Sequence, residues 1–295
     1  MNNINASSLF HFTKDYGTLQ NIIKNGLRYS FAFENLSPKI IANFADPYAP
    51  VAKTYQKAGV AIPMVSFCDI PITRSLEHID KYGGYIIGLD KDFIIRFYNL
   101  TLNPVIYINS KNLIKCIEDL AVIYAELEKN VLQLILNFSK KGDAQFNLNQ
   151  YKDDLNPLLN RKFNVKFIVG LVKACYDKYD QRCYYDEREW RAILMDGLND
   201  VSNWKCGVVR EEYDAFRLKW NNELSKSKDN FFTVSENNLD NVITHIVVKS
   251  EKEIPEIINA IMKLNSIFGS VNVTEKDRLV LISKVTSLER IGKDY

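Results

Sequence analysis

Two carboxylates and an arginine stand at alternate positions late in the chain, as Glu187, Glu189 and Arg191. Residues two apart in an extended strand project from the same face, so these side chains are predicted to lie together. Adjacent carboxylates repel each other, and a buried pair needs protons or a cationic partner, which Arg191 could supply. One carboxylate could position a ribose hydroxyl and stabilise an oxocarbenium-like centre, while the second contacts the attacking group. The alternative is an ordinary ion pair on a solvated strand face.

A histidine and a threonine alternate in the same way near the start of the chain, as His11 and Thr13. They lie in a short apolar segment, and the whole sequence contains three histidines. An imidazole fixed in such a strand could donate a hydrogen bond to a ligand hydroxyl, with the Thr13 hydroxyl orienting it. The alternative is a core histidine that bonds a backbone group.

Ser66 and Cys68 share one face of a predicted strand that runs into a proline turn. Because no neighbouring histidine activates Cys68, we expect a strand end there and not a nucleophile. Tyr82 follows His78 by four residues on a predicted helix, and a tyrosine ring could stack on nicotinamide. His11, His78 and Cys68 lack tight metal-ligand spacing, so no metal site is predicted.

Periodicity predicts the elements that must position these residues. The predicted strands cover residues 8–13, 62–68, 84–89, 104–108, 184–194 and 243–248. The predicted helices cover a segment from an N-cap at Thr18 to Gly26, residues 73–81, residues 112–138, and a segment that begins at the capping box of Ser250 and Glu253. Residues 30–60 are predicted to form a long loop. Strands and helices are mixed without regular alternation, which predicts an α+β fold in one domain over residues 1–295, with a helical insertion at 112–180.

Composition limits the class of protein. The 295 residues are 46% hydrophobic with a formal net charge of +2, so there is no strong global field to attract nucleic acid or membrane. Five cysteines without CxxC spacing argue against a disulfide framework or a zinc site. Without a signal-peptide pattern or an apolar run of about 20 residues, a cytoplasmic location and no membrane partner are expected. The short signatures of P-loop, Rossmann, α/β-hydrolase and zincin enzymes are absent from the sequence.

Six segments together resemble the AbiGi family of abortive phage-resistance proteins. They read SLFHFTK, TLQNIIKNGL, IPMVSFCDIPIT, EHIDKYGGYIIGLDKDF, NPVIYI and YYDEREWRA, and they cover residues 8 to about 108 and 184–194. The resemblance implies anti-phage defence. It also implies an antitoxin-like member of a two-gene system, which binds and controls a partner toxin or senses a phage component.

A more distant resemblance connects the chain to the ADP-ribosyltransferase fold, including DarT-like DNA-modifying toxins. It rests on a first-strand His-x-Thr, a helix ending in NGL, and a central strand followed by a short helix with a tyrosine. It implies an NAD-binding mixed β core that transfers ADP-ribose to a nucleic acid or protein. His11 and Thr13 would then bind the adenosine side or ribose of NAD, and Tyr82 would pack on the nicotinamide.

The same resemblance assigns the remaining site residues. Glu187-Arg188-Glu189 resembles the Glu-x-Glu of arginine-directed transferases. By this resemblance Glu189 is the catalytic carboxylate, and Glu187 orients or deprotonates the acceptor. Arg191 would hold a carboxylate or a phosphate bidentately. Ser66 would line the NAD site, although Ser66-Phe67-Cys68 departs from the usual Ser-Thr-Ser.

Overall fold

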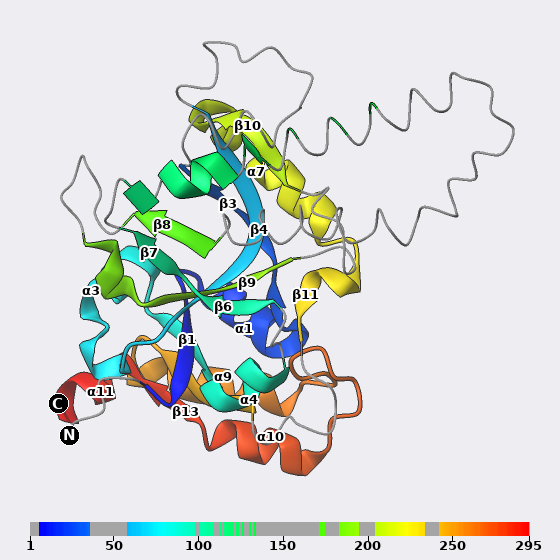
Figure 1. The fold of residues 1–295 in the computed structure, drawn as a ribbon. Helices are drawn as coiled ribbons and strands as arrows, with labels where there is room; N and C mark the ends of the chain where they lie inside the picture. The colour runs from blue at the N-terminus through cyan, green and yellow to red at the C-terminus, as the bar shows by residue number, and fades with distance from the viewer. Residues whose placement is uncertain are drawn as a thin grey trace, which may run out of the picture.

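A mixed α+β fold is built around one large, mostly antiparallel sheet (Figure 1). The computed structural model describes residues 6–35, 58–97, 101–108, 171–174, 183–194, 204–233 and 242–294, with single positions between 112 and 133. Within these residues the sheet has nine strands in the order β13-β12-β5-β1-β4-β9-β6, with β3 and β10 also paired to β4. The strands are β1 (Ser8–Thr13), β3 (Ser30–Glu34), β4 (Ala58–Cys68), β5 (Tyr85–Asp90), β6 (Leu102–Pro104), β9 (Glu189–Ile193), β10 (Lys205–Val209), β12 (Ile243–Val248) and β13 (Val285–Ser287).

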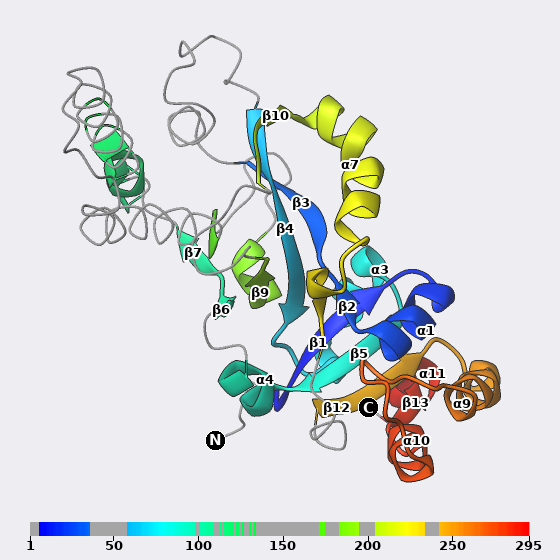
Figure 2. The same cartoon turned by 90° about the vertical axis from the view of Figure 1, so that its right-hand side faces the viewer.

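The sheet changes direction between β1 and β4. β1 pairs with β5 along its whole length, from Ser8 opposite Asp90 to Thr13 opposite Tyr85. With β4, by contrast, its register gives the single pair Phe10 and Cys68. Figure 2 shows β4 rising away from β1 and β5. The end of β1 that carries His11 and Thr13 therefore lies at the division between the two halves of the sheet.

Helices cover the half of the sheet that contains β1, β5 and β12, and α7 packs on the other half (Figures 1 and 2). The helices are α1 (Tyr16–Asn25), α3 (Leu76–Tyr82), α4 (Lys91–Phe97), α7 (Arg210–Leu224), α9 (Ile254–Met262), α10 (Glu275–Ile282) and α11 (Leu288–Asp294). Two small sheets complete the fold, one from β2 (Leu27–Arg28) and β11 (Phe231–Phe232), the other from β7 (Ile106–Ile108) and β8 (Val172–Ala174).

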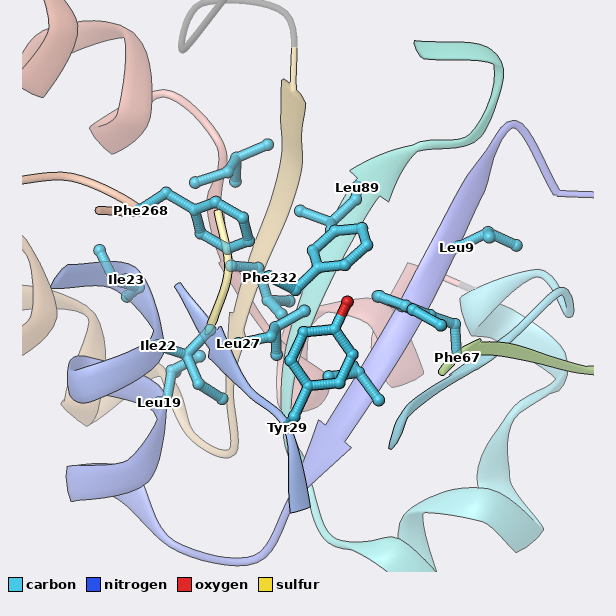
Figure 3. Packing of buried hydrophobic residues seen from close by; sticks show 14 of the residues in the cluster. Leu9, Leu19, Ile22, Ile23, Leu27, Tyr29, Phe67, Leu89, Phe232 and Phe268 are labelled. Atoms are coloured by element: carbon cyan, nitrogen blue, oxygen red, sulfur yellow. The ribbon is translucent and has the colours of Figure 1, made fainter. Parts of the chain in front are cut away.

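The main core lies between α1 and the sheet. Figure 3 shows the predicted stripe of Leu19, Ile22 and Ile23 on α1 facing the rings of Phe232 and Phe268. All five side chains are buried. Apolar residues at i, i+3 and i+4 form one face of a helix, which explains why this short segment folds as it does.

Several predicted elements are confirmed. Residues 8–13 form β1, 84–89 lie largely in β5, 243–248 form β12, and the capping box of Ser250 and Glu253 precedes α9. The positions described between 112 and 133 are helical, as predicted. The rest of the predicted insertion, other than 171–174, lies outside the described residues. None of the described helices is long and apolar enough to cross a membrane.

Other predicted elements were wrong in part. The N-cap of α1 is Asp15 and not Thr18, since the Asp15 side chain accepts the Gly17 amide. Residues 30–34 of the predicted loop form β3, because pairing with β4 satisfies their backbone; residues 36–57 lie outside the description. Residues 104–108 do not form one strand: Pro104 ends β6, and Ile106 begins β7 in another sheet.

Replacing Gly26 with alanine is expected to destabilise the fold by roughly 3 kcal/mol. Gly26 has φ of 87°, and a Cβ there would lie 2.6 Å from the carbonyl oxygen of Phe232. Backbone strain and steric overlap both oppose alanine. Gly292 in α11 has no heavy atom within 4 Å of its Cβ position. Gly292→Ala is therefore the matched control, expected to be neutral or to stabilise by up to about 1 kcal/mol. Urea unfolding of both variants measures the contrast, and an equal effect of the two would contradict it.

Candidate functional site

Six charged side chains from five segments form one connected cluster, here called the ion network. Its carboxylates and cations alternate through hydrogen bonds in the order Glu34, Arg191, Glu189, Lys173, Glu187, Lys81. Three negative and three positive groups therefore balance. Such pairing is what allows charged groups to lie at low solvent exposure.

Glu189 is the centre of the ion network. Its Oε1 accepts hydrogen bonds from the Ser66 hydroxyl at 2.8 Å and from Arg191 Nε at 2.9 Å. Its Oε2 accepts from Lys173 Nζ at 3.0 Å and from Arg191 Nη2 at 3.2 Å. The register of β4 and β9 places Ser66 opposite Arg191, which explains how residues distant in sequence share one face. The prediction that Arg191 supplies the cation for this carboxylate is confirmed.

Glu187 also belongs to the ion network, but it does not lie on the strand that was predicted to contain it. Residues 184–187 form a 3₁₀ turn, Arg188 adopts the left-handed conformation with φ of 42°, and β9 begins only at Glu189. The prediction of one strand over 184–194 was therefore wrong. The Cys68 thiol donates to the Glu187 carbonyl, and the Asp69 amide donates to the Arg188 carbonyl, so contacts with the end of β4 fix this turn.

Lys173 links the two carboxylates directly. Its ammonium lies 2.7 Å from Glu187 Oε2 and 3.0 Å from Glu189 Oε2. Lys173 is on β8, where it pairs with Tyr107 of β7, and the Tyr107 hydroxyl accepts the Glu189 amide. Glu187 has two further donors on its Oε1, Lys81 Nζ at 2.5 Å and the Tyr82 hydroxyl at 3.1 Å.

The network fixes the charge of its members. Burial opposes ionisation of Glu189, but Arg191 and Lys173 outweigh it and lower its pKa to about 2. Burial likewise opposes ionisation of Glu187, and Lys173 and Lys81 lower the pKa of that carboxyl. Burial dominates at Glu34, whose pKa is raised in spite of Arg191. Glu187 and Glu189 are therefore anions at neutral pH, and Lys173, whose pKa is raised by both carboxylates against the effect of burial, is a cation.

Stability is expected to fall as the pH drops below about 5. A carboxyl whose folded pKa is depressed stabilises the fold above its unfolded pKa and loses that contribution as the pH approaches the folded value. For Glu189, lowered from 4.5 to about 2, the contribution is on the order of 3 kcal/mol. Glu34 has the opposite sign and offsets part of the loss, because protonation favours its buried form. Urea midpoints at pH 7, 4.5 and 3 should decline less in Glu189→Gln than in wild type, and parallel declines would contradict this assignment.

His11 reaches the site from β1. Its Nδ1 lies 2.9 Å from the carbonyl oxygen of Ser66, so the imidazole spans the division between β1 and β4. A carbonyl can only accept, so Nδ1 carries the proton, and burial lowers the pKa of His11 and favours the neutral ring. Nε2 of the neutral ring is then an acceptor, whereas the sequence analysis expected His11 to act as a donor.

Tyr82 and Thr13 lie on either side of a close backbone contact. Tyr82, 36% exposed, lies beneath the Lys81 ammonium, 4.5 Å from its ring centroid, and its ring is 6.0 Å from that of His78. A Cβ on the next residue, Gly83, would overlap the Thr13 carbonyl. Thr13 is therefore close to the chain at Tyr82, although among the described residues its side chain makes no hydrogen bond to the ion network.

Cys68 is held as a neutral thiol. Burial raises its pKa to about 12, and its Sγ donates to the Glu187 carbonyl. This agrees with the expectation that Cys68 is no nucleophile, because the thiolate is the reactive form. Within the described ranges, no group of three His, Cys, Asp or Glu side chains is arranged to hold a metal ion.

Of the predicted site residues, Ser66, Tyr82, Glu187, Glu189 and Arg191 thus meet in one cluster, and His11 joins it through one backbone bond. Sequence reasoning missed Glu34, Lys81, Lys173 and Tyr107. Lys173 had a usable signal, because it is the one charge in the apolar run at 167–175. Glu34 also had one, since it follows the alternating Phe31 and Phe33.

The comparisons with known proteins agree on a family. The profile of the family described as "Putative abortive phage resistance protein AbiGi, antitoxin" matches residues 52–243. A curated protein from Lactococcus lactis subsp. cremoris, "Abortive phage resistance protein AbiGi", is 25% identical over 252 residues, which cover 79% of this chain and 89% of the relative. A search of solved structures gives no significant match.

Proposed function

The chain belongs to the AbiGi family of abortive phage resistance proteins. We propose that it acts in anti-phage defence, which this membership supports, and that it does so through an NAD site, which the geometry of the ion network supports. The proposed reaction is transfer of ADP-ribose from NAD to a nucleic-acid or protein acceptor, on an ADP-ribosyltransferase-like core. Glu189 is the proposed catalytic carboxylate.

The observation that carries this proposal is the adjacency of β1, β4 and β9 in the sheet. The distant resemblance requires the first-strand histidine, the central-strand serine and the late glutamate to meet, and scattered strands would have ruled it out. His11 bonds the Ser66 carbonyl, and the Ser66 hydroxyl bonds Glu189, although 123 positions separate the last two residues.

The chemistry of the residues fits a glycosidic cleavage. In NAD, a bond joins the nicotinamide nitrogen to the anomeric carbon of ribose. When this bond breaks, its electron pair leaves with nicotinamide, and positive charge develops at the anomeric carbon. Glu189, ionised at neutral pH, stabilises that charge. Glu187 orients the acceptor, since its lowered pKa makes it a weak base, and the acceptor's proton passes to solvent. Tyr82 offers a partly exposed ring for nicotinamide, and Arg191 holds the carboxylates of Glu34 and Glu189 in place.

Labelled NAD tests the proposal with a matched pair of histidine variants. Wild type should bind NAD and release nicotinamide when DNA, RNA, lysate and phage components are supplied. His11→Ala should weaken binding about tenfold, the value of one hydrogen bond to a ligand hydroxyl. His245→Ala is the control, because His245 is also partly buried but bonds Thr244 on β12. Absence of NAD binding and turnover in wild type and in every variant of the ion network would overturn the proposal.

A second candidate is a non-catalytic antitoxin that binds a partner toxin or a phage component. The family description includes the word antitoxin, and every oxygen of Glu187 and Glu189 already accepts protein donors, as in a structural ion network. Co-expression with a toxic product of a neighbouring gene, in a host challenged with phage, tests this candidate. If wild type and Glu189→Gln neutralise the toxin equally, the result favours the antitoxin. If Glu189→Gln loses both NAD turnover and neutralisation, a non-catalytic antitoxin is excluded.

A further inference from the structure

The hydrogen bonds of Glu189 leave no acceptor position open for a ligand. An ionised carboxylate offers about four lone-pair positions. In Glu189 four donors occupy them: the Ser66 hydroxyl, Arg191 Nε, Arg191 Nη2 and Lys173 Nζ. A ribose hydroxyl can therefore reach this carboxylate only if one of these donors leaves.

The three residues that supply these donors differ in how firmly the fold holds them. Ser66 and Arg191 face each other on β4 and β9 inside the large sheet, and Arg191 also bonds Glu34. Lys173 lies on β8, whose three residues pair with β7 in a separate two-stranded sheet. Its ammonium ends a flexible four-carbon stem, and such a side chain can move without breaking a strand pair. Of the two cations that bond Glu189, Lys173 is therefore the one that can leave without disturbing the large sheet.

We propose that Lys173 is an autoinhibitory residue, whose ammonium occupies the position that the ribose of the substrate takes between Glu187 and Glu189. This inference rests on the proposed NAD site and adds its regulation. The ammonium presents positive charge and hydrogen-bond donors to both carboxylates. A ribose with hydroxyl groups and a developing positive charge presents the same features, so the two compete for one place.

Glu187 and Glu189 each keep hydrogen-bond donors when Lys173 leaves. Glu187 keeps Lys81 and the Tyr82 hydroxyl, and Glu189 keeps Arg191 and Ser66. Displacement of Lys173 therefore leaves each carboxylate with at least one hydrogen-bond donor. A partner or phage component that moves β8 would open the site by the same step.

Lys173→Met tests the proposal because methionine keeps an unbranched apolar stem and removes the ammonium. Lys91→Met is the matched control: both lysine side chains are 16% exposed and each pairs with a carboxylate, but Lys91 pairs with Asp69 outside the ion network. NAD affinity by calorimetry and nicotinamide release are measured for wild type, Lys173→Met, Lys173→Arg and Lys91→Met.

The expected result is NAD binding about tenfold or more tighter in Lys173→Met, with faster nicotinamide release, because the closed state no longer competes. Lys173→Arg and Lys91→Met should resemble wild type. If wild type binds NAD and Lys173→Met binds it equally or more weakly, the autoinhibitory role is overturned and the NAD site still stands. Absence of NAD binding in every variant would overturn the NAD site and this inference together. If Lys173→Met does not fold by circular dichroism, Lys173→Gln, a shorter neutral side chain, decides between the same outcomes.

Discussion

Arg191→Met is expected to destabilise the protein by about 4 kcal/mol, the largest stability effect of any single change in the ion network. The Arg191 side chain is 1% exposed, and its guanidinium bonds Glu34 at 2.7 Å and both oxygens of Glu189. Methionine fills part of the volume but leaves Glu34 without the cation that it bonds, and leaves Glu189 with Lys173 as its remaining cation. Removing one partner of a buried pair costs far more than the pair contributes, because the remaining charge cannot regain its hydration.

Urea unfolding of Arg191→Met measures this loss, and a charge-balanced variant separates charge from packing. Adding Glu34→Gln leaves two carboxylates and two cations in the ion network, and it should recover most of the lost stability. Arg191→Lys keeps the charge but not the planar fork, and its stability should fall between those of wild type and Arg191→Met. A loss that persists in the double variant would show that packing of the guanidinium, and not its charge, stabilises this part of the sheet.

Local patterns sufficed to predict the parts of the fold that local physics decides. Alternation in residues 8–13 predicted β1, and the stripe of Leu19, Ile22 and Ile23 predicted α1. The capping box at Ser250 predicted the start of the helical segment that contains α9. Each of these elements buries a periodic apolar face, so its own sequence carries the signal.

The candidate site needed information that no local pattern contains. The separation of Glu187 from β9 depends on a left-handed arginine, and contacts with the end of β4 hold Arg188 in that conformation. Arginine has no preference for this region, so the local sequence predicts a continuous strand. Glu34 was hidden because β3 is stabilised by pairing with a strand that begins 24 residues later, at Ala58.

Lys173 was hidden for a different reason. Its strand pairs with β7 across more than sixty positions, and a lone lysine in an apolar run has no partner in its own segment. The carboxylates that explain it lie 14 and 16 residues further along the chain. The ion pair of Glu189 and Arg191 was predicted because alternation places both side chains on one strand face, and this part of the prediction is confirmed.

Glu189→Gln is expected to lower nicotinamide release by about a thousandfold while NAD affinity changes little. The amide is nearly isosteric with the carboxylate but carries no charge. Positive charge at the anomeric carbon develops in the transition state and not in bound NAD, so loss of the carboxylate should reduce kcat and leave KM nearly unchanged. The low pKa of Glu189 implies that wild-type activity does not depend on protonation of this residue near neutral pH.

Glu34→Gln is the control that separates chemistry from stability. Glu34 bonds the same arginine as Glu189, but it lies on β3 and, within the described part of the chain, makes no hydrogen bond to Ser66 or Lys173. Both variants remove one carboxylate from the ion network, so both should loosen it to a similar extent. If turnover falls in Glu189→Gln and persists in Glu34→Gln, the effect comes from the charge at the proposed reaction centre. If turnover falls equally in both variants, the two glutamates act by holding Arg191, and Glu189 would be a positioning residue in a network that stabilises the sheet.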